Sequence, residues 1–506
     1  MKIKFTFLVL ALLLASVVSW GQTLTVMPST LRFNAALEVH PFIITSNTAW
    51  IVKSNANWLK FTPASGSNSM EVTVTAQANT TGEQRTATIT VEGTGAPTRT
   101  INVIQSATFY WELTATMSAT LDNKGVLTID TNKNSESMPN DTPWDSRSDS
   151  IKSVVFKTGV DSILHYAFSD YKNLASVTMA NTIKTIGEGA FENCINLTSI
   201  TIPNSVTRIG EAAFWKCTGL KSLTLGSSLT TIGIEAFAFC TGLTSVSIPN
   251  SVTRINEAAF YRCTGLKSLT LGSSLTTINK EVFAFCTDLD FVTIPSSVKT
   301  IGEKAFTGCT NLSSLAIGNA VTTIDIDAFL DCSSLTSVTF PNTVKTIGMR
   351  AFRDCSSLNS ITIPNSVSDI GQNAFQNCSK LKNVKVEWTK PLTVPYNTFN
   401  GVNVHDATLH VPAGTESAYS NAQVWKDFTI ATIVGNENIE SKSLKAWSDN
   451  NHIHICGLYR GEPLSIYNLA GQILYQGRAK AEEEHISLGI DGFFIVVAGE
   501  RRVMVR

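Results

Sequence analysis

Phenylalanine recurs every 23 residues through the middle of this chain, ten times without an insertion. The ten positions are Phe168, Phe191, Phe214, Phe237, Phe260, Phe283, Phe306, Phe329, Phe352 and Phe375. One unit of this length cannot bury its own apolar face, so neighbouring units must stack and share an elongated core. The period therefore predicts a solenoid rather than a globule.

Cysteine follows the same period. Nine of the ten cysteines, from Cys194 to Cys378, lie three residues after all but the first of these phenylalanines. Stacked units bring such residues within disulfide range, but an odd number at one inward position favours buried free thiols that behave as small hydrophobes. The zinc-binding spacing CxxC is missing.

The repeat unit reads CxxLxxLxIPxSVxxIGxxAFxxC. A period in the low twenties is typical of leucine-rich repeats, in which each unit contributes one strand and a short helical return. Residues 151–402 resemble the BspA-like leucine-rich-repeat family. The resemblance extends to an N-terminal cap at 107–150 and a C-terminal cap at 403–435. In the latter, four apolar side chains would cover the open end: Val411, Tyr419, Trp425 and Phe428.

Residues 22–106 alternate apolar and polar side chains between turn-forming segments, which predicts a β-sandwich. The stretch from Thr48 to Gly93 resembles the BACON domain, an Ig-like module whose membership implies carbohydrate or mucin contact. Trp50 is predicted to fill the sandwich core, since one large aromatic residue usually occupies it. Trp58 is a candidate carbohydrate contact, which would require an exposed ring face.

The two ends of the chain predict an export route. Lys2 and Lys4 precede an apolar run and small residues, so residues 1–21 are predicted to be a signal peptide. Residues 436–446 are polar and linker-like. Residues 447–506 resemble the type A sorting domain of the type IX secretion system, on the pattern Asn468, Gly471, Gly492, Phe494, Val496 and Gly499. That resemblance implies export across the outer membrane of a Gram-negative cell, and the secretion machinery as a partner.

Charge and motifs exclude several functions. The net charge of −1 provides no electrostatic footprint for nucleic acid. No nucleophile elbow, phosphate loop or zinc-protease motif occurs, so we expect no catalytic residues, no cofactor and no enzyme. Asp130 to Glu136 alternates like a calcium loop, but Ser135 replaces the required glycine and a plain polar loop is favoured. His452, His454 and Cys456 share one strand face without a fourth metal ligand, so we expect no metal site.

The strand of each repeat leaves two outward positions, which we expect to form a concave face that is nearly uncharged and rich in hydroxyls. The first position is Ser176, Ser199, Ser222, Ser245, Ser268, Phe291, Ser314, Ser337, Ser360 and Asn383. The second is Thr178, Thr201, Thr224, Ser247, Thr270, Thr293, Ala316, Thr339, Thr362 and Lys385. Strand propensity and solubility alone would explain the hydroxyls. A binding face centred on an exposed Phe291 is the alternative, with contacts from Ser245, Ser268, Thr270, Thr293 and Ser314.

These observations predict a mainly β chain: an Ig-like β-sandwich, a leucine-rich-repeat solenoid built on a parallel sheet, and a small C-terminal β-sandwich. The favoured function is a secreted or cell-surface interaction protein, since the BspA-like resemblance implies adhesion to host matrix proteins or other bacterial cells. The alternative is a glycan- or mucin-binding accessory protein that uses the BACON-like domain as its reader.

Overall fold

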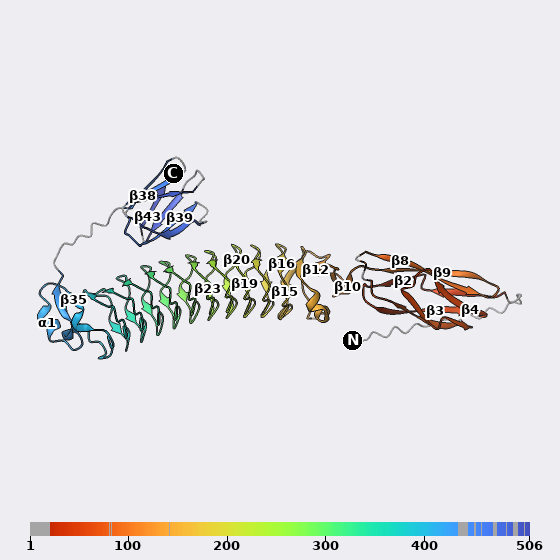
Figure 1. The fold of residues 1–506 in the computed structure, drawn as a ribbon, viewed down its shortest axis with the longest axis horizontal. Helices are drawn as coiled ribbons and strands as arrows, with labels where there is room; N and C mark the ends of the chain where they lie inside the picture. Colours follow the sequence, from red (N-terminus) through yellow and green to blue (C-terminus); the bar gives the residue numbers. More distant parts are fainter. Residues whose placement is uncertain are drawn as a thin grey trace. The chain divides into compact units, whose positions relative to one another are not determined.

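The computed structural model describes residues 21–433 except 80, 82 and 141, and residues 444–505 except 450, 451, 457, 469–472, 482, 489–493 and 500. The predicted signal peptide, most of the predicted linker, and Gly471 and Gly492 of the sorting pattern lie outside the described residues. Two compact units divide the chain near Trp111. The mainly β fold class is confirmed (Figure 1).

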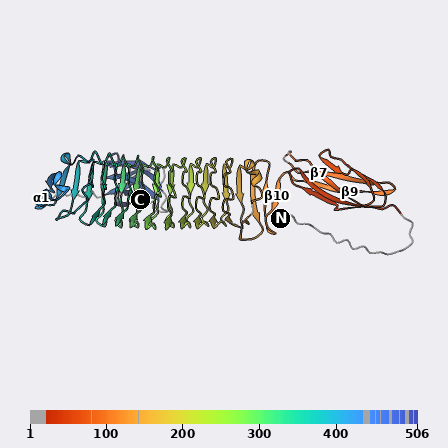
Figure 2. The same ribbon diagram turned by 90° about the horizontal axis from the view of Figure 1, so that it is seen from below.

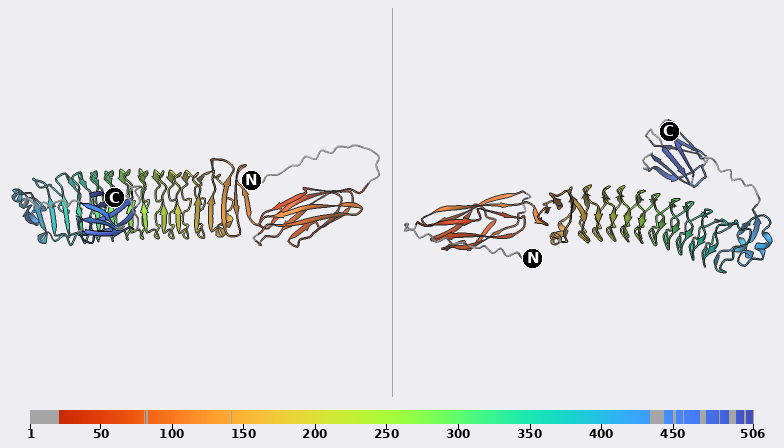
Figure 3. Two further views of the ribbon diagram at one scale, coloured as in Figure 1. Left: turned by 90° about the horizontal axis from the view of Figure 1, so that it is seen from above. Right: turned by 180° about the vertical axis from the view of Figure 1, so that it is seen from behind.

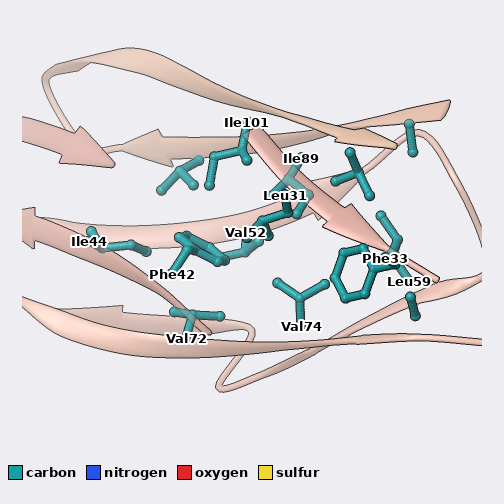
Figure 4. Packing of buried hydrophobic residues seen from close by; sticks show 14 of the residues in the cluster. Leu31, Phe33, Phe42, Ile44, Val52, Leu59, Val72, Val74, Ile89 and Ile101 are labelled. Carbon is teal, nitrogen blue, oxygen red and sulfur yellow. The ribbon is translucent and has the colours of Figure 1, made fainter. Parts of the chain in front are cut away.

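The N-terminal domain is a sandwich of two sheets, with strand orders β1-β3-β7-β5 and β2-β9-β8-β4-β6. Its strands are β1 (Leu24–Met27), β2 (Thr30–Phe33), β3 (Glu38–Ser46), β4 (Ala49–Ser54), β5 (Leu59–Thr62), β6 (Ser65–Ser67), β7 (Met70–Ala76), β8 (Arg85–Gly93) and β9 (Ala96–Gln105). Pairing is antiparallel, except that β2 pairs with β9 in parallel. Inward side chains of both sheets, such as Phe42 and Ile89, fill one core (Figure 4).

The segment between the sandwich and the repeats adds strands to the solenoid. It contains β10 (Phe109–Glu112), β11 (Met117–Leu121), β12 (Val126–Thr131), β13 (Glu136–Ser137), the 3-10 helix η1 (Asp145–Ser150) and β14 (Ser153–Phe156). β12 and β14 pair in parallel, and β14 pairs in parallel with the first repeat strand. The buried ring of Trp144 stacks on Phe168, with centroids 6.0 Å apart. Trp144 therefore closes the N-terminal end of the aromatic stack.

Each repeat forms one coil with two short strands, which together give two columns of parallel strands along the array (Figure 2). The longer column is β16 (Ser176–Met179), β18 (Ser199–Thr201), β20 (Ser222–Thr224), β22 (Ser245–Ser247), β24 (Ser268–Thr270), β26 (Phe291–Thr293), β28 (Ser314–Ala316), β30 (Ser337–Thr339), β32 (Ser360–Ile363) and β34 (Asn383–Val386). The shorter column is β15 (Val160–Ile163), β17 (Thr185–Ile186), β19 (Arg208–Ile209), β21 (Thr231–Ile232), β23 (Arg254–Ile255), β25 (Thr277–Ile278), β27 (Thr300–Ile301), β29 (Thr323–Ile324), β31 (Thr346–Ile347) and β33 (Asp369–Ile370).

The expected helical returns are wrong. In the described repeats the return segment is a two-residue strand followed by turns. Most coils have two corner residues with positive φ, one two residues before the repeated phenylalanine and one two residues after it, such as Ala212 and Lys216. Left-handed backbone at such corners interrupts a right-handed helix, and β-branched Thr-Ile pairs suit the short strand.

The repeated phenylalanines form one continuous stack inside the coils. Neighbouring ring centroids from Phe168 to Phe399 lie 5.1 to 5.7 Å apart, and their planes differ by at most 17°. All ten predicted phenylalanines are 0% exposed. The regular spacing of the coils is visible from two further directions (Figure 3).

The repeated cysteines join each coil to the one before it. All nine are buried and free. The thiol of Cys217, for example, donates to the carbonyl oxygen of Phe191 at 3.1 Å, and the other eight thiols make the equivalent bond at up to 3.4 Å. A sulfur donor that also fills apolar volume satisfies a buried carbonyl at this position.

The C-terminal end of the solenoid is closed by η2 (Val404–Asp406), β35 (Thr408–Val411), α1 (Glu416–Ser420), η3 (Trp425–Asp427) and β36 (Thr429–Thr432). β34, β35 and β36 pair in parallel, which continues the longer strand column. The predicted covering residues are all buried. The ring centroids of Trp425 and Phe428 lie 5.7 and 5.2 Å from the ring centroid of Phe399. The predicted role of these side chains is confirmed.

The last strands are β37 (Lys445–Asp449), β38 (His452–Cys456), β39 (Pro463–Asn468), β40 (Ile473–Arg478), β41 (Glu483–Ser487), β42 (Phe494–Ala498) and β43 (Arg501–Val505). They form two antiparallel sheets, ordered β37-β38-β41 and β40-β39-β42-β43. A separate core fills this domain, with Ile455, Leu464 and Val496 among its buried residues. None of the described helices is long and apolar enough to cross a membrane.

Candidate binding surfaces

The outward positions of β16 to β34 form the surface that we call the hydroxyl face. Residues on strands such as β22 alternate as predicted, with Val246 inward and the flanking Ser245 and Ser247 outward. The alternation is lost on β26 and β28. Register is kept between paired strands, so Ser245 lies beside Ser268 and Ser247 beside Thr270. Ser245 and Thr293 are exposed, whereas Ser268, Thr270 and Ser314 are half-buried. The structure therefore places the predicted contact residues on one face.

The expected exposure of Phe291 is wrong, because its side chain is only 9% exposed. On the neighbouring strand β28, Ser314 lies beside Phe291. A buried ring cannot serve as the exposed contact that the repeat pattern predicted.

The two tryptophans of the sandwich have different environments. Trp50 is 3% exposed and its indole N–H donates to the carbonyl of Asn68 at 2.8 Å, which confirms the predicted core role. Trp58 is half-buried against the same core, and the guanidinium of Arg85 lies 4.3 Å from its ring centroid. A sugar stacked on that ring face would have to displace Arg85, so the geometry offers no open platform at Trp58.

The acidic loop from Asp130 to Glu136 is organised around one carboxylate. Glu136 accepts hydrogen bonds from the hydroxyls of Thr131, Thr116 and Thr114. These bonds, that of Thr131 first, lower the pKa of Glu136 to about 2. A carboxylate already satisfied by three hydroxyls is a structural anchor for the cap, and this geometry favours the polar-loop interpretation over a calcium loop.

The histidines near the C-terminus belong to a sheet surface. Ile453 and Ile455 are 1% exposed in the core of the domain, as the alternating pattern predicts. His454 faces His485 of the neighbouring strand, with ring centroids 4.6 Å apart. Within the described part of the chain, no group of three or more His, Cys, Asp or Glu side chains is arranged to hold a metal ion.

A second surface was not predicted from the sequence. Between the repeated phenylalanine and cysteine of four consecutive coils lie half-buried aromatic residues, which we call the aromatic row: Trp215, Phe239, Tyr261 and Phe285. Their rings meet edge to face, with centroid distances of 5.9, 5.5 and 5.6 Å along the row. Alignment of the two residues between Phe and Cys in successive repeats would have revealed it.

Two cations lie on the aromatic row. The ammonium of Lys216 is 3.9 Å from the ring centroid of Trp215. The guanidinium of Arg262 lies within 6 Å of three rings, at 5.9 Å from Phe239, 5.5 Å from Tyr261 and 5.0 Å from Phe285. Cations over aromatic faces are attracted by the ring quadrupole, which holds these two side chains against the row.

Comparison with known proteins places the repeats in a family. Residues 146–267, 230–358 and 322–454 match the model described as BspA type leucine rich repeat region, and together they span more than half of the chain. The chain belongs to the BspA-type leucine-rich-repeat family. Its N-terminal domain is BACON-like, since residues 23–108 match the model described as viral BACON domain. BspA-like leucine-rich-repeat proteins are typically found at the cell surface.

Two solved structures resemble this BspA-type protein. A leucine-rich repeat protein from Bacteroides ovatus is 22% identical with a TM-score of 0.39, and the match covers 64% of this chain and 100% of that one. A leucine rich cell surface protein from Faecalibacterium prausnitzii is also 22% identical with a TM-score of 0.39, over 65% of this chain and 96% of that one.

One curated relative is an enzyme. The xyloglucan-specific endo-beta-1,4-glucanase BoGH5A of Bacteroides ovatus is 36% identical over 76 residues, which is 15% of each chain. Because the BspA-type protein spans only about 15% of that relative, the match assigns no enzymatic activity to it. The family that covers most of this chain is a repeat family suited to protein interaction.

Proposed function

We propose that this protein is a secreted, surface-displayed adhesin that binds host matrix proteins or other bacterial cells through the hydroxyl face. The observation that supports this proposal is the register of that face: Ser and Thr side chains repeat in line from coil to coil, as Ser199 beside Ser222 and Thr201 beside Thr224. A stacked array presents one extended surface to a large partner. Weak hydrogen bonds repeated along such a surface add to a specific contact.

The experiment introduces bulky charge on the hydroxyl face. Ser222→Arg with Ser245→Arg should abolish adhesion of the purified full chain to immobilised matrix proteins and to bacterial cells, because both positions are exposed and central. Thr253→Arg is the matched control, since Thr253 is exposed on the shorter strand side of the coil. Equal adhesion of the double variant and the control would show that the partner does not bind this face.

Glycan binding by the BACON-like domain is the alternative function. The guanidinium of Arg85 lies over the ring of Trp58 and would block a sugar from stacking on that face. We therefore assign the BACON-like domain the role of a spacer that carries the repeats. A glycan array probed with the full chain and with Trp58→Ala tests this assignment. Glycan binding that disappears in the Trp58 variant would instead establish the domain as the reader.

We also propose that the C-terminal β-domain is an export signal for type IX secretion. Support comes from its own antiparallel sheets and separate core, which allow it to fold as a module distinct from the coils. The sorting-domain resemblance of residues 447–506 gives the route, with the secretion machinery as the partner.

A further inference from the structure

The aromatic row differs from the rest of the array at a corner position whose left-handed backbone conformation is unfavourable for bulky residues. The corner residue two positions after each repeated phenylalanine has positive φ, between 55° and 60° at Lys216, Phe239, Arg262 and Phe285. The other coils place residues that tolerate this conformation there: Asp170, Asn193, Gly308, Asp331, Asp354, Asn377 and Gly401. Bulky side chains rarely adopt left-handed backbone, and such departures cluster at functional sites.

A glycine of the next coil makes room for the last ring of the row. A side chain at Gly308 would place its Cβ only 2.6 Å from Cδ1 of Phe285. The ring of Phe285 therefore lies on the bare backbone of the next coil. Absence of a side chain at Gly308 allows the fourth ring to complete the row.

Of the two cations, Arg262 is the more available to an anionic partner, since Lys216 already has a favourable charge interaction with the carboxylate of Glu192. Arg262 Nε donates to Tyr261 Oη at 3.2 Å. Among the described residues, no carboxylate lies within 4.0 Å of the charged nitrogens of Lys216 or Arg262. A guanidinium that aromatic rings orient, and that has no carboxylate partner among the described residues, is suited to bidentate binding of a carboxylate.

The spacing of the row selects the shape of the partner. Lys216 and Arg262 occupy equivalent positions two coils apart, so at about 4.8 Å per strand they lie roughly 10 Å apart along the array. A polyproline II helix advances about 3.1 Å per residue with three residues per turn, so every third side chain recurs on one face after roughly 9 Å. Proline-rich segments dock on strips lined by aromatic side chains, and the four half-buried rings of the row form such a strip.

We propose that the aromatic row binds a proline-rich protein segment in the polyproline II conformation that carries a carboxylate at every third residue. Consecutive carboxylates pair with Lys216 and Arg262, and proline rings pack on the parts of the four aromatic side chains that these two cations leave uncovered. This site lies outside the hydroxyl face and does not depend on its function. An acidic polysaccharide is disfavoured because rings that meet at 72° to 85° do not form a flat platform for sugars.

Fluorescence anisotropy of a labelled (Pro-Pro-Glu)6 peptide with the purified full chain tests the proposal. We expect saturable binding that weakens with salt, and at least about a tenfold loss of affinity in the double variant Phe239→Asn, Phe285→Asn. Asparagine occurs at the same corner in Asn193 and Asn377, so these substitutions suit the backbone. Arg262→Asn should remove the preference for (Pro-Pro-Glu)6 over (Pro-Pro-Gln)6, while the hydroxyl-face double variant Ser222→Arg, Ser245→Arg binds like wild type.

Three results overturn the proposal. The first is no binding of the peptide to the wild-type chain, and the second is equal affinity in the Phe239, Phe285 double variant. The third is tighter binding of a helical acidic peptide or of polygalacturonate, which would assign the row to another class of partner. Because the hydroxyl-face variant is measured beside the row variant, failure of this site is distinguishable from failure of the adhesion proposal.

Discussion

At the scale of single residues, the buried stack of phenylalanines contributes strongly to the free energy of unfolding of the array. The ring of Phe260 is 0% exposed and lies 5.2 Å from Phe237 and 5.6 Å from Phe283. Phe260→Ala would leave a cavity in this stack, so we expect a loss of about 3 to 5 kcal/mol in unfolding free energy. Urea unfolding followed by circular dichroism measures it.

The matched control for this substitution is Ile234→Ala, since Ile234 is 41% exposed on a neighbouring coil. That change should cost less than about 1 kcal/mol. Nearest-neighbour coupling also predicts that the Phe260 variant unfolds in two steps, one on each side of the damaged coil. A single transition with an unchanged midpoint would refute the role given to the stack.

The nine buried repeat cysteines, which we call the cysteine ladder, should make the free energy of unfolding fall at alkaline pH. Burial raises the pKa of the Cys217 and Cys263 thiols to about 12, whereas an unfolded cysteine ionises near pH ~8.5. Below that pH both states are protonated and stability does not depend on these thiols. Above it only the unfolded state loses protons, so the free energy of unfolding falls by about 1.4 kcal/mol per thiol and pH unit until the folded thiols ionise.

This dependence is tested by the slope of stability against pH between 9 and 11. Cys217→Ala with Cys263→Ala should make the slope shallower, whatever the two cavities cost at neutral pH. In parallel, iodoacetamide followed by mass spectrometry should modify the nine buried cysteines only after denaturation. Modification of the native ladder at pH 8, or identical slopes for the two proteins, would contradict the inference.

At the scale of elements, the caps hold the ends of the solenoid. Trp425 is 0% exposed, contacts Trp388 at 5.9 Å and donates its indole N–H to the carbonyl of Leu392 at 2.7 Å. Trp425→Ala should cost about 3 to 5 kcal/mol. Hydrogen exchange should locate the loss in the last coils, because each coil contacts only its neighbours.

An exposed tyrosine near the C-terminal cap provides the control for the Trp425 substitution. Tyr396 is 81% exposed, so Tyr396→Ala should leave exchange in the last coils unchanged. Fast exchange throughout the array in the Trp425 variant would mean that the coils unfold as one unit. That outcome would contradict the nearest-neighbour description of the repeats.

Elements also show what the sequence could predict. Inward and outward positions follow from alternation, so the longer strands, the buried Phe and Cys columns and the apolar cap residues were all predictable. Helical returns were expected from the general leucine-rich-repeat pattern, but the two left-handed corners of most coils override it. The aromatic row stayed hidden because its members alternate between two repeat positions, Trp215 and Tyr261 at one, Phe239 and Phe285 at the next.

At the scale of the whole molecule, independent modules follow one another along the chain. The sandwich, the coils and the C-terminal domain each have their own core. The burial of Phe291 could not be predicted, because the repeat pattern treats its position like those of Ser268 and Ser314 on the neighbouring strands. Local patterns determine each module, but not the environment of a single residue that departs from the repeat.

Separate cores predict that the C-terminal domain can be removed without unfolding the repeats. In a host with a type IX secretion system, a chain lacking residues 443–506 should fold but remain in the periplasm, because the removed domain is proposed to be the export signal. Protease treatment of intact cells measures display: the wild type should be cleaved and the shortened chain protected. A periplasmic reporter fused to residues 443–506 is the matched control and should reach the surface. Surface display of the shortened chain, or retention of the fused reporter, would show that these strands serve the folded protein and not its export.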